Sequence, residues 1–307
     1  MNTQQSFDRY LTYLNAVGRS QATVKAYQSK CRDFVSLYSD QAVDTITPDD
    51  IDDYFVALRG RSGRWQDHPC KPAVDGGLSH STIYSIMRHV RSFLNFCATR
   101  GYCSISPAAH LRIKKKRKSN YKAHDPVAVE KLQKALLSGD SRGCKRDAAL
   151  LRLFLDTGGR AGELCAAVRD TLDTDRCRVY FDNGKTGDGW LYFSPDSLQI
   201  VRDWLAVAPA SEWLFCSVWL TTGEQIDSNT VWQIFDRRKK QFGITGRINP
   251  HSHRHAVGQA WAQEHGLRLA QAKLRHVDIN STMVYASPDD EMIQKLTAKT
   301  SLVPTTT

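Results

Sequence analysis

A short segment of the chain, NPHSHRHAVG (residues 249–258), places three histidines and one arginine within five residues. A zinc site is one interpretation, but on a helix only His251 and His255 share a face, and no third ligand of suitable spacing is visible. His251 and Arg254 are three residues apart, so a helix would place both on one face. An imidazole that titrates near neutral pH beside a permanently charged guanidinium suits acid–base chemistry on an anion.

Other chemically capable residues lie on both sides of this segment. Arg160 follows two glycines in DTGGRAGEL, with Glu163 three residues on, and Lys185 lies at the turn of NGKTGDG. His276 in LRHVDIN is followed nine residues later by Tyr285. Each alone has an ordinary explanation: a surface ion pair, a solvated lysine, a packed tyrosine. Together with the first segment they form an ordered set of two arginines, one lysine, two histidines and one tyrosine.

The elements that carry these residues belong to a mixed region downstream of residue 125. Apolar spacing and capping residues predict helices at 126–138, 142–157, 160–168, 195–206, 228–242, 250–264 and 268–275. The stretch CRVYFDNGKTGDGWLYFS (177–194) has strand-forming residues on both sides of a Gly-rich turn, which predicts a hairpin. Asn249 is expected to cap its helix, with Pro250 at the first position. The chain has no Gly-rich phosphate loop of the nucleotide-binding kind, so nothing indicates ATP.

The region upstream of residue 110 reads as entirely helical. Apolar faces at helical spacing run through residues 7–17 and 24–38, a capping box at 47–50 opens a third helix, and a fourth spans Ser81 to Arg100. The Gly- and Pro-rich residues 60–77 predict a long loop. His68 and Cys70 in that loop are too few to indicate a metal site.

Charge indicates the class of partner. A formal net charge of +10 favours a polyanion, with nucleic acid first and an anionic membrane surface second. The run RIKKKRK (112–118) holds six cations in seven residues, and we expect it to be an inter-domain linker that lies along phosphates; a solvated linker without contacts is the alternative. The expected DNA-binding residues are Arg88, Arg91, Lys114, Lys115, Lys116, Arg117 and Lys118.

Length and composition set the remaining limits. The 307 residues suit two domains of ordinary globular composition, and no apolar run approaches the about 20 residues of a membrane span. The N-terminus lacks a signal-peptide core, so we expect a cytoplasmic protein, associated with the nucleoid of a bacterium or archaeon. The eight cysteines form no CxxC pair, which predicts buried, reduced thiols.

The ordered set of residues resembles that of the tyrosine recombinases, also called phage integrases. The family's first box, Thr-Gly-x-Arg-x-x-Glu-Leu, corresponds to residues 157–164. Its second, His-x-Leu-Arg-His, corresponds to 251–255, and its third, Leu-Gly-His with a later tyrosine, to 274–276 and Tyr285. Any one box alone is weakly specific, whereas the set is highly specific.

The resemblance implies a mainly α protein with a small β-sheet. A four-helix, SAM-like core-binding domain (1–110) would be joined by the basic linker (111–124) to an α+β catalytic domain (125–307) that ends in a tail helix at 289–299. It further implies double-stranded DNA with paired inverted-repeat core sites, and a homo-tetramer or a hetero-tetramer with a related recombinase. No metal, cofactor, small-molecule substrate or membrane is expected.

The chemistry of such a reaction assigns a role to each residue. Arg160 and Arg254 would neutralise the phosphodiester as it becomes more negative. Tyr285 would be the nucleophile, His251 the base that accepts its proton, and Lys185 the acid for the leaving 5′-oxygen. The resemblance also implies that His276 hydrogen-bonds a phosphate oxygen. Supporting roles are expected for Glu163 and His255.

Several positions depart from the family pattern. Arg275 replaces the glycine of the third box, which either changes the end of its helix or adds a cation near the phosphate. His253 replaces a leucine that the family buries, and Gly162 costs about 1 kcal/mol of helix propensity. None of these changes removes a catalytic group.

Three functions remain open on the sequence. The first is a site-specific recombinase that either moves a mobile element or resolves chromosome or plasmid multimers. The second is a type IB topoisomerase, which relaxes supercoils by swivelling one strand. The third is a DNA-binding protein that has kept only the fold.

Overall fold

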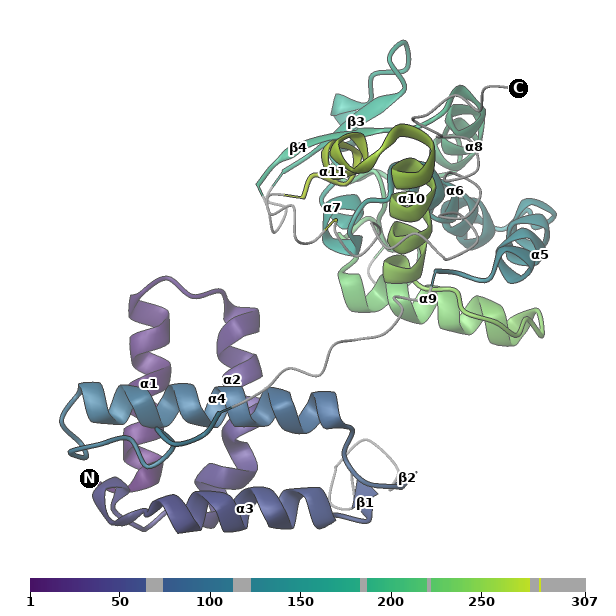
Figure 1. Cartoon of the computed structure of the whole chain (residues 1–307). Coiled ribbons are helices and arrows are strands. Elements are labelled where there is room, and N and C mark those ends of the chain that lie inside the picture. The colour runs from purple at the N-terminus through teal and green to yellow at the C-terminus, as the bar shows by residue number, and fades with distance from the viewer. Residues whose placement is uncertain (65–73, 113–122, 183–186, 220–221, 277–281, 283–307) are drawn as a thin grey trace, which may run out of the picture. The chain divides into compact units, whose positions relative to one another are not determined.

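The computed structural model describes residues 1–64, 74–112, 123–182, 187–219, 222–276 and 282 (Figure 1). The chain forms two compact units, Met1–Ser119 and Asn120–Thr307. None of the helices in the described part of the chain combines the length and the hydropathy that a membrane span requires.

The first unit is a helical bundle. Its helices are α1 (Thr3–Ala16), α2 (Gln21–Leu37), α3 (Pro48–Gly60) and α4 (His80–Thr99), with a 3-10 turn at Val43–Thr45. Polar caps start them: the side chains of Asn2, Ser20, Thr47 and Ser79 each accept a backbone N–H of the first turn. Helix α4 packs against the other three. The predicted helices and the capping box at Thr47 are thereby confirmed.

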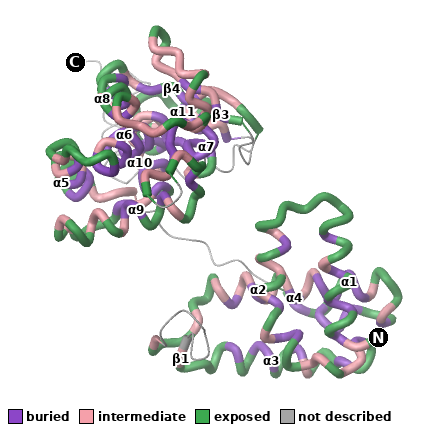
Figure 2. Tube along the Cα trace, turned by 180° about the vertical axis from the view of Figure 1, so that it is seen from behind, coloured by how far each residue is buried: buried purple, intermediate pink, exposed green. Residues whose placement is uncertain are grey.

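The core of this unit is largely the one predicted. Phe34 of α2 and Val90 and Phe93 of α4 are fully buried, and purple inward faces alternate with green outward faces along each helix (Figure 2). Val17, predicted on the inner face of the first helix, is instead exposed, because α1 ends at Ala16 and Val17 is its C-cap. The prediction of buried faces therefore fails at Val17 because this residue lies beyond the end of the helix.

The connection between α3 and α4 is not wholly a loop, so that expectation was wrong at its ends. Strands β1 (Gly63–Arg64) and β2 (Val74–Asp75) pair antiparallel, with Gly63 opposite Asp75. The residues between them, including His68 and Cys70, lie outside the described part of the chain.

The second unit combines helices with one hairpin. In chain order its elements are α5 (Pro126–Leu137), α6 (Arg142–Thr157), α7 (Ala161–Cys165), a 3-10 turn (Arg169–Thr171), β3 (Arg178–Phe181), β4 (Gly189–Tyr192), α8 (Pro195–Leu205), α9 (Ser228–Gln241), α10 (Pro250–His265) and α11 (Leu267–Leu274). Helix α6 is central, since it packs against α5, α8, α10 and β4. Strands β3 and β4 pair antiparallel, as the hairpin pattern predicted. The mainly α fold with small β-sheets is therefore confirmed.

One predicted helix, 160–168, is much shorter in the structure. It ends at Cys165, and the next residues extend between β3 and residues 212–214. Val168 donates its N–H to the carbonyl of Tyr180, at 2.9 Å. The two neighbouring segments supply hydrogen-bond partners for the N–H and C=O groups of these residues. Those partners are distant in sequence, so the local sequence pattern does not reveal the pairing.

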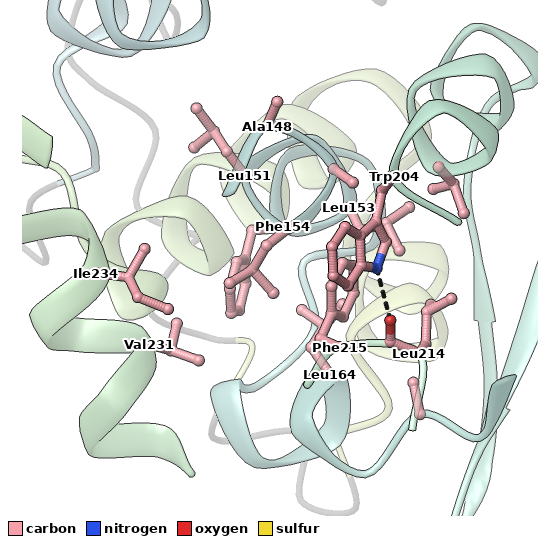
Figure 3. Packing of buried hydrophobic residues seen from close by; sticks show 14 of the residues in the cluster. Ala148, Leu151, Leu153, Phe154, Leu164, Trp204, Leu214, Phe215, Val231 and Ile234 are labelled. Carbon is pink, nitrogen blue, oxygen red and sulfur yellow. Dashed lines mark hydrogen bonds between the residues drawn. The ribbon is translucent and has the colours of Figure 1, made fainter. Parts of the chain in front are cut away.

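Around α6 lies the larger hydrophobic core. Figure 3 shows Leu153 and Phe154 of α6 packed among side chains of α7, α8 and α9. The fully buried Trp204 donates its Nε1–H to the carbonyl of Leu214 at 2.8 Å, which fixes α8 against the segment that follows it (Figure 3). Among the described cysteines all are free thiols, and all but Cys177 are buried, as predicted. This core is the rigid support for the turn that follows α6.

Candidate active site

The turn after α6 explains the glycines of the DTGGRAGEL segment. Gly158 ends α6 in the left-handed conformation, with φ of 58°. A Cβ there would lie 2.7 Å from Cδ2 of Leu274 and 3.0 Å from Cγ1 of Val257, so α10 and α11 leave room for glycine alone. The hydroxyl of Thr157 donates to the carbonyl of Leu153 and accepts the N–H of Gly159. The chain is thus forced to turn sharply just before Arg160.

Arg160 is the N-cap of α7 and is tied to Glu163. Its backbone N–H donates to Oε2 of Glu163 at 2.9 Å, and its Nη1 donates to Oε1 at 2.7 Å. Glu163 is fully buried. Burial alone would raise the pKa of Glu163, but the guanidinium of Arg275 and hydrogen bonds from both arginines hold it below its usual value. The carboxylate stays charged and fixes Arg160 by main chain and side chain together.

Arg254 connects two segments that are distant in sequence. Its helix, α10, is capped by Asn249, whose side chain accepts the N–H of Ser252, as predicted. The guanidinium is buried; its Nη1 donates to the carbonyl of Gly158 at 2.8 Å and its Nη2 to that of Leu274 at 2.5 Å. One side chain therefore clamps the chain two residues before Arg160 and two residues before His276.

His276 lies at the same place. Its Nδ1 is 2.8 Å from the hydroxyl of Thr282. Burial lowers the pKa of His276 to about 4, and the charges of Arg254 and Arg160 act in the same direction. This imidazole is therefore neutral at neutral pH. The structure brings together Arg160, Glu163, Arg254 and His276.

The other expected site residues are only partly placed. His251 is exposed in the first turn of α10, and His255 is half-buried one turn further on. On α4 of the first unit, Arg88 is exposed, with its guanidinium 5.9 Å from the ring centroid of Tyr84, and Arg91 is half-buried. The residues that fall outside the described part of the chain are Lys185, Tyr285, the cations 114–118 and the tail 289–299.

His253, which the sequence left unexplained, is a core residue. It is fully buried, its ring lies against those of Phe154 and Phe235, and its Nδ1 is 3.0 Å from Nδ1 of His124. Burial lowers its pKa to about 3, and the neighbouring His124 acts in the same direction. A neutral ring thus occupies the space expected for leucine. Among the described residues, no three His, Cys, Asp or Glu side chains gather to hold a metal ion.

Replacing His253 by leucine is expected to reduce the loss of stability at acid pH. In the unfolded chain His253 takes up a proton near pH 6.5, whereas the folded protein resists protonation down to about pH 3. Within this window the free energy of unfolding falls as pH falls, so the group lowers it by about 2 kcal/mol at pH 5. Urea unfolding at pH 7.5 and 5.0 measures the difference, and tryptophan fluorescence reports the second unit, which holds six of the seven tryptophans.

The matched control is His265→Leu, which makes the same substitution at an exposed position of the same helix. The pH dependence should depart from that of the wild type more in His253→Leu than in His265→Leu. An unchanged pH dependence in His253→Leu would contradict the assignment of His253 as a neutral core residue.

Arg275 does not change the type of helix end, which was the first of the two alternatives offered by the sequence. It was expected inside a helix ending at residue 275, but α11 ends at Leu274 and Arg275 is its C-cap, with φ of 53°. The helix end is therefore the left-handed one that glycine would give. The guanidinium turns to Oε2 of Glu163. His124 was not identified from the sequence, because its role depends on its contact with His253, which forms only in the folded chain.

The chain is similar in sequence to known proteins. A sequence model of the phage integrase family matches residues 125–292. The tyrosine recombinase XerC of Alcanivorax borkumensis is 27% identical over 298 residues, covering 94% of this chain and 91% of the relative. The tyrosine recombinase XerA of Saccharolobus solfataricus is 25% identical over 289 residues, covering 92% and 88%.

Solved structures show the same fold. The Tn1549 transposon integrase in complex with transposon right end DNA matches with a TM-score of 0.75 at 13% identity, covering 97% of this chain and 99% of that one. A lambda integrase dimer bound to a core site matches with a TM-score of 0.69 at 19% identity, covering 94% and 97%. At these identities the likeness concerns the fold.

Proposed function

Since this chain belongs to the phage integrase family, and relatives along most of its length are tyrosine recombinases, we propose that it is a site-specific recombinase. It breaks and rejoins DNA strands through a 3′-phosphotyrosyl intermediate. The observation that carries the proposal is the clamp formed by Arg254. Its guanidinium holds the segments that present Arg160 and His276, so the three side chains meet from three separate elements.

The arrangement suits a phosphodiester. Two guanidiniums placed in advance stabilise the negative charge that develops on the non-bridging oxygens. Glu163 keeps Arg160 in place, since rearranging a buried, ion-paired carboxylate is costly. When the Thr282 hydroxyl donates to Nδ1 of His276, the proton of this neutral ring lies on Nε2, which donates to a phosphate oxygen.

The transfer steps balance without an added cofactor. The phenolic oxygen of Tyr285 attacks phosphorus, its proton passes to His251, and the bond from phosphorus to the 5′-oxygen breaks. Lys185 protonates the leaving 5′-oxygen. The phosphotyrosyl bond keeps the free energy of the broken phosphodiester, so attack by a 5′-hydroxyl reseals the strand without ATP.

The proposed partner is double-stranded DNA with paired inverted repeats, bound by four subunits, which are copies of this chain or include a related recombinase. Integration or excision of a mobile element and resolution of multimers are both roles for such an enzyme. The proposed DNA contacts outside the site are those of Arg88, Arg91, Lys114, Lys115, Lys116, Arg117 and Lys118.

The test uses DNA carrying the inverted repeats found beside the gene, built as a nicked suicide duplex and also as a plasmid with two copies of the site. With EDTA present and without ATP, the proposal expects a covalent protein–DNA adduct on the duplex and recombinant circles from the plasmid. Supercoil relaxation without recombinants, on plasmids lacking the site, would identify a topoisomerase instead. Retention of the DNA with no covalent adduct would identify a binding protein.

A further inference from the structure

Arg275 adopts a backbone conformation that favours glycine, so the reason for an arginine at this position lies in its side chain. Its φ of 53° is in the left-handed region, where a residue with a side chain is strained and glycine is not. Glycine, which the family pattern has here, would make the same turn without that strain. The arginine instead brings a guanidinium to the fully buried carboxylate of Glu163.

The contacts of that guanidinium leave it little freedom. One Nη donates to Oε2 of Glu163, and the other donates to the carbonyl of Lys273 at 3.3 Å. The guanidinium carbon lies 5.5 Å from the ring centroid of Phe181 on β3. The side chain is mostly covered, at 22% exposure. Arg275 is therefore held between α11, the hairpin and α7.

The contact between Arg275 and Glu163 changes the net charge of the cluster. Arg160 and Glu163 alone form a neutral pair, and a buried carboxylate beside a phosphodiester opposes the charge that develops during cleavage. With Arg275 the cluster carries a net positive charge. Because Oε2 accepts both the Arg160 N–H and the Arg275 guanidinium, Arg275 also holds the carboxylate in the orientation that fixes Arg160.

We propose that Arg275 is a positioning residue for DNA strand cleavage, which acts through Glu163 to orient Arg160 and to offset the carboxylate charge. The inference rests on the proposed function, and it adds a residue at a position where the family pattern has glycine. Arg275 is not placed in contact with the phosphate.

The main test compares single-turnover cleavage of the suicide duplex by wild type and by Arg275→Gly, which keeps the backbone turn and removes the guanidinium. At saturating DNA the cleavage rate constant should fall about 10- to 100-fold, the scale of a misplaced catalytic group. DNA affinity, measured with Tyr285→Phe in both backgrounds, should change by less than about threefold. Arg275→Lys retains the charge without the fork and should cleave faster than Arg275→Gly.

A double-mutant cycle separates action through Glu163 from a general structural role. In a Glu163→Gln background, Arg275→Gly should cost less than about threefold, because the carboxylate on which it acts is gone. Equal losses in both backgrounds, wild-type cleavage by Arg275→Gly, or no advantage of Arg275→Lys would each overturn the inference.

Cys177→Gly is the matched control. Cys177 and Arg275 are the described non-glycine residues with positive φ, and Cys177, at 47°, has no place in the site. Its replacement by glycine should leave cleavage unchanged, so backbone relaxation alone would not account for the Arg275→Gly result. Failure of the wild type to form an adduct would refute the proposed function itself. An adduct with wild-type kinetics in Arg275→Gly would refute this inference alone.

Discussion

With Tyr285 replaced by phenylalanine, the protein is expected to bind its DNA site and to form no covalent adduct. Phenylalanine keeps the ring and removes only the oxygen that is proposed to attack phosphorus. The contacts described above hold Arg160 through Glu163 and Arg254 through two backbone carbonyls. The proposed phosphate-binding groups therefore remain, while the proposed nucleophile is lost.

The measurement is denaturing electrophoresis of protein incubated with the suicide duplex, beside a binding titration at fixed salt. The adduct should fall below detection, and the dissociation constant should stay within about threefold of the wild type, because phosphate contacts dominate affinity. Tyr192→Phe, at an exposed tyrosine of β4, is the matched control and should form the adduct normally. An unchanged adduct yield in Tyr285→Phe would mean that another residue is the nucleophile.

Much of this fold is encoded locally, which is why the sequence predicts it. Helices α5, α6, α8, α9 and α10 begin within a residue of the predicted position, because a cap or a proline at the first turn satisfies or removes an unpaired backbone N–H. The hairpin is specified by strand formers around a turn. Where pairing is with distant segments, as after α7, the prediction fails.

The order of the site residues could be read from the sequence, but their contacts could not. Nothing local shows that Arg254 donates to the carbonyls of Gly158 and Leu274, since those partners depend on how α6, α10 and α11 pack. His253 is unexplained until Phe154 and Phe235 surround it. The partner of Arg275, 112 residues away in sequence, is likewise a product of the folded core.

Replacement of Arg254 is expected to separate its proposed role, binding the phosphate, from its structural role, which is to join α10 to the segments at Gly158 and Leu274. In Arg254→Ala two carbonyls, of Gly158 and Leu274, lose their donors beneath the surface, so the free energy of unfolding should fall by about 2–5 kcal/mol. Arg254→Lys keeps the positive charge, but its ammonium group can replace at most part of the hydrogen bonding to these two carbonyls. We expect it to lose less stability, yet at least about 100-fold in the cleavage rate constant, because one ammonium cannot match the paired donors of a guanidinium.

A second buried arginine of the same unit makes the comparison decisive. Arg146 on α6 is 2% exposed. It pairs with Asp147 and donates to the carbonyl of Cys216, and neither partner is a site residue. Arg146→Lys should cost stability, measured by urea unfolding, without selective loss of cleavage at a temperature where the protein is folded. If Arg254→Lys cleaved DNA as well as Arg146→Lys at equal folded fraction, Arg254 would be a structural clamp alone. A loss confined to Arg254→Lys requires its guanidinium to act on the phosphate as well as on the fold.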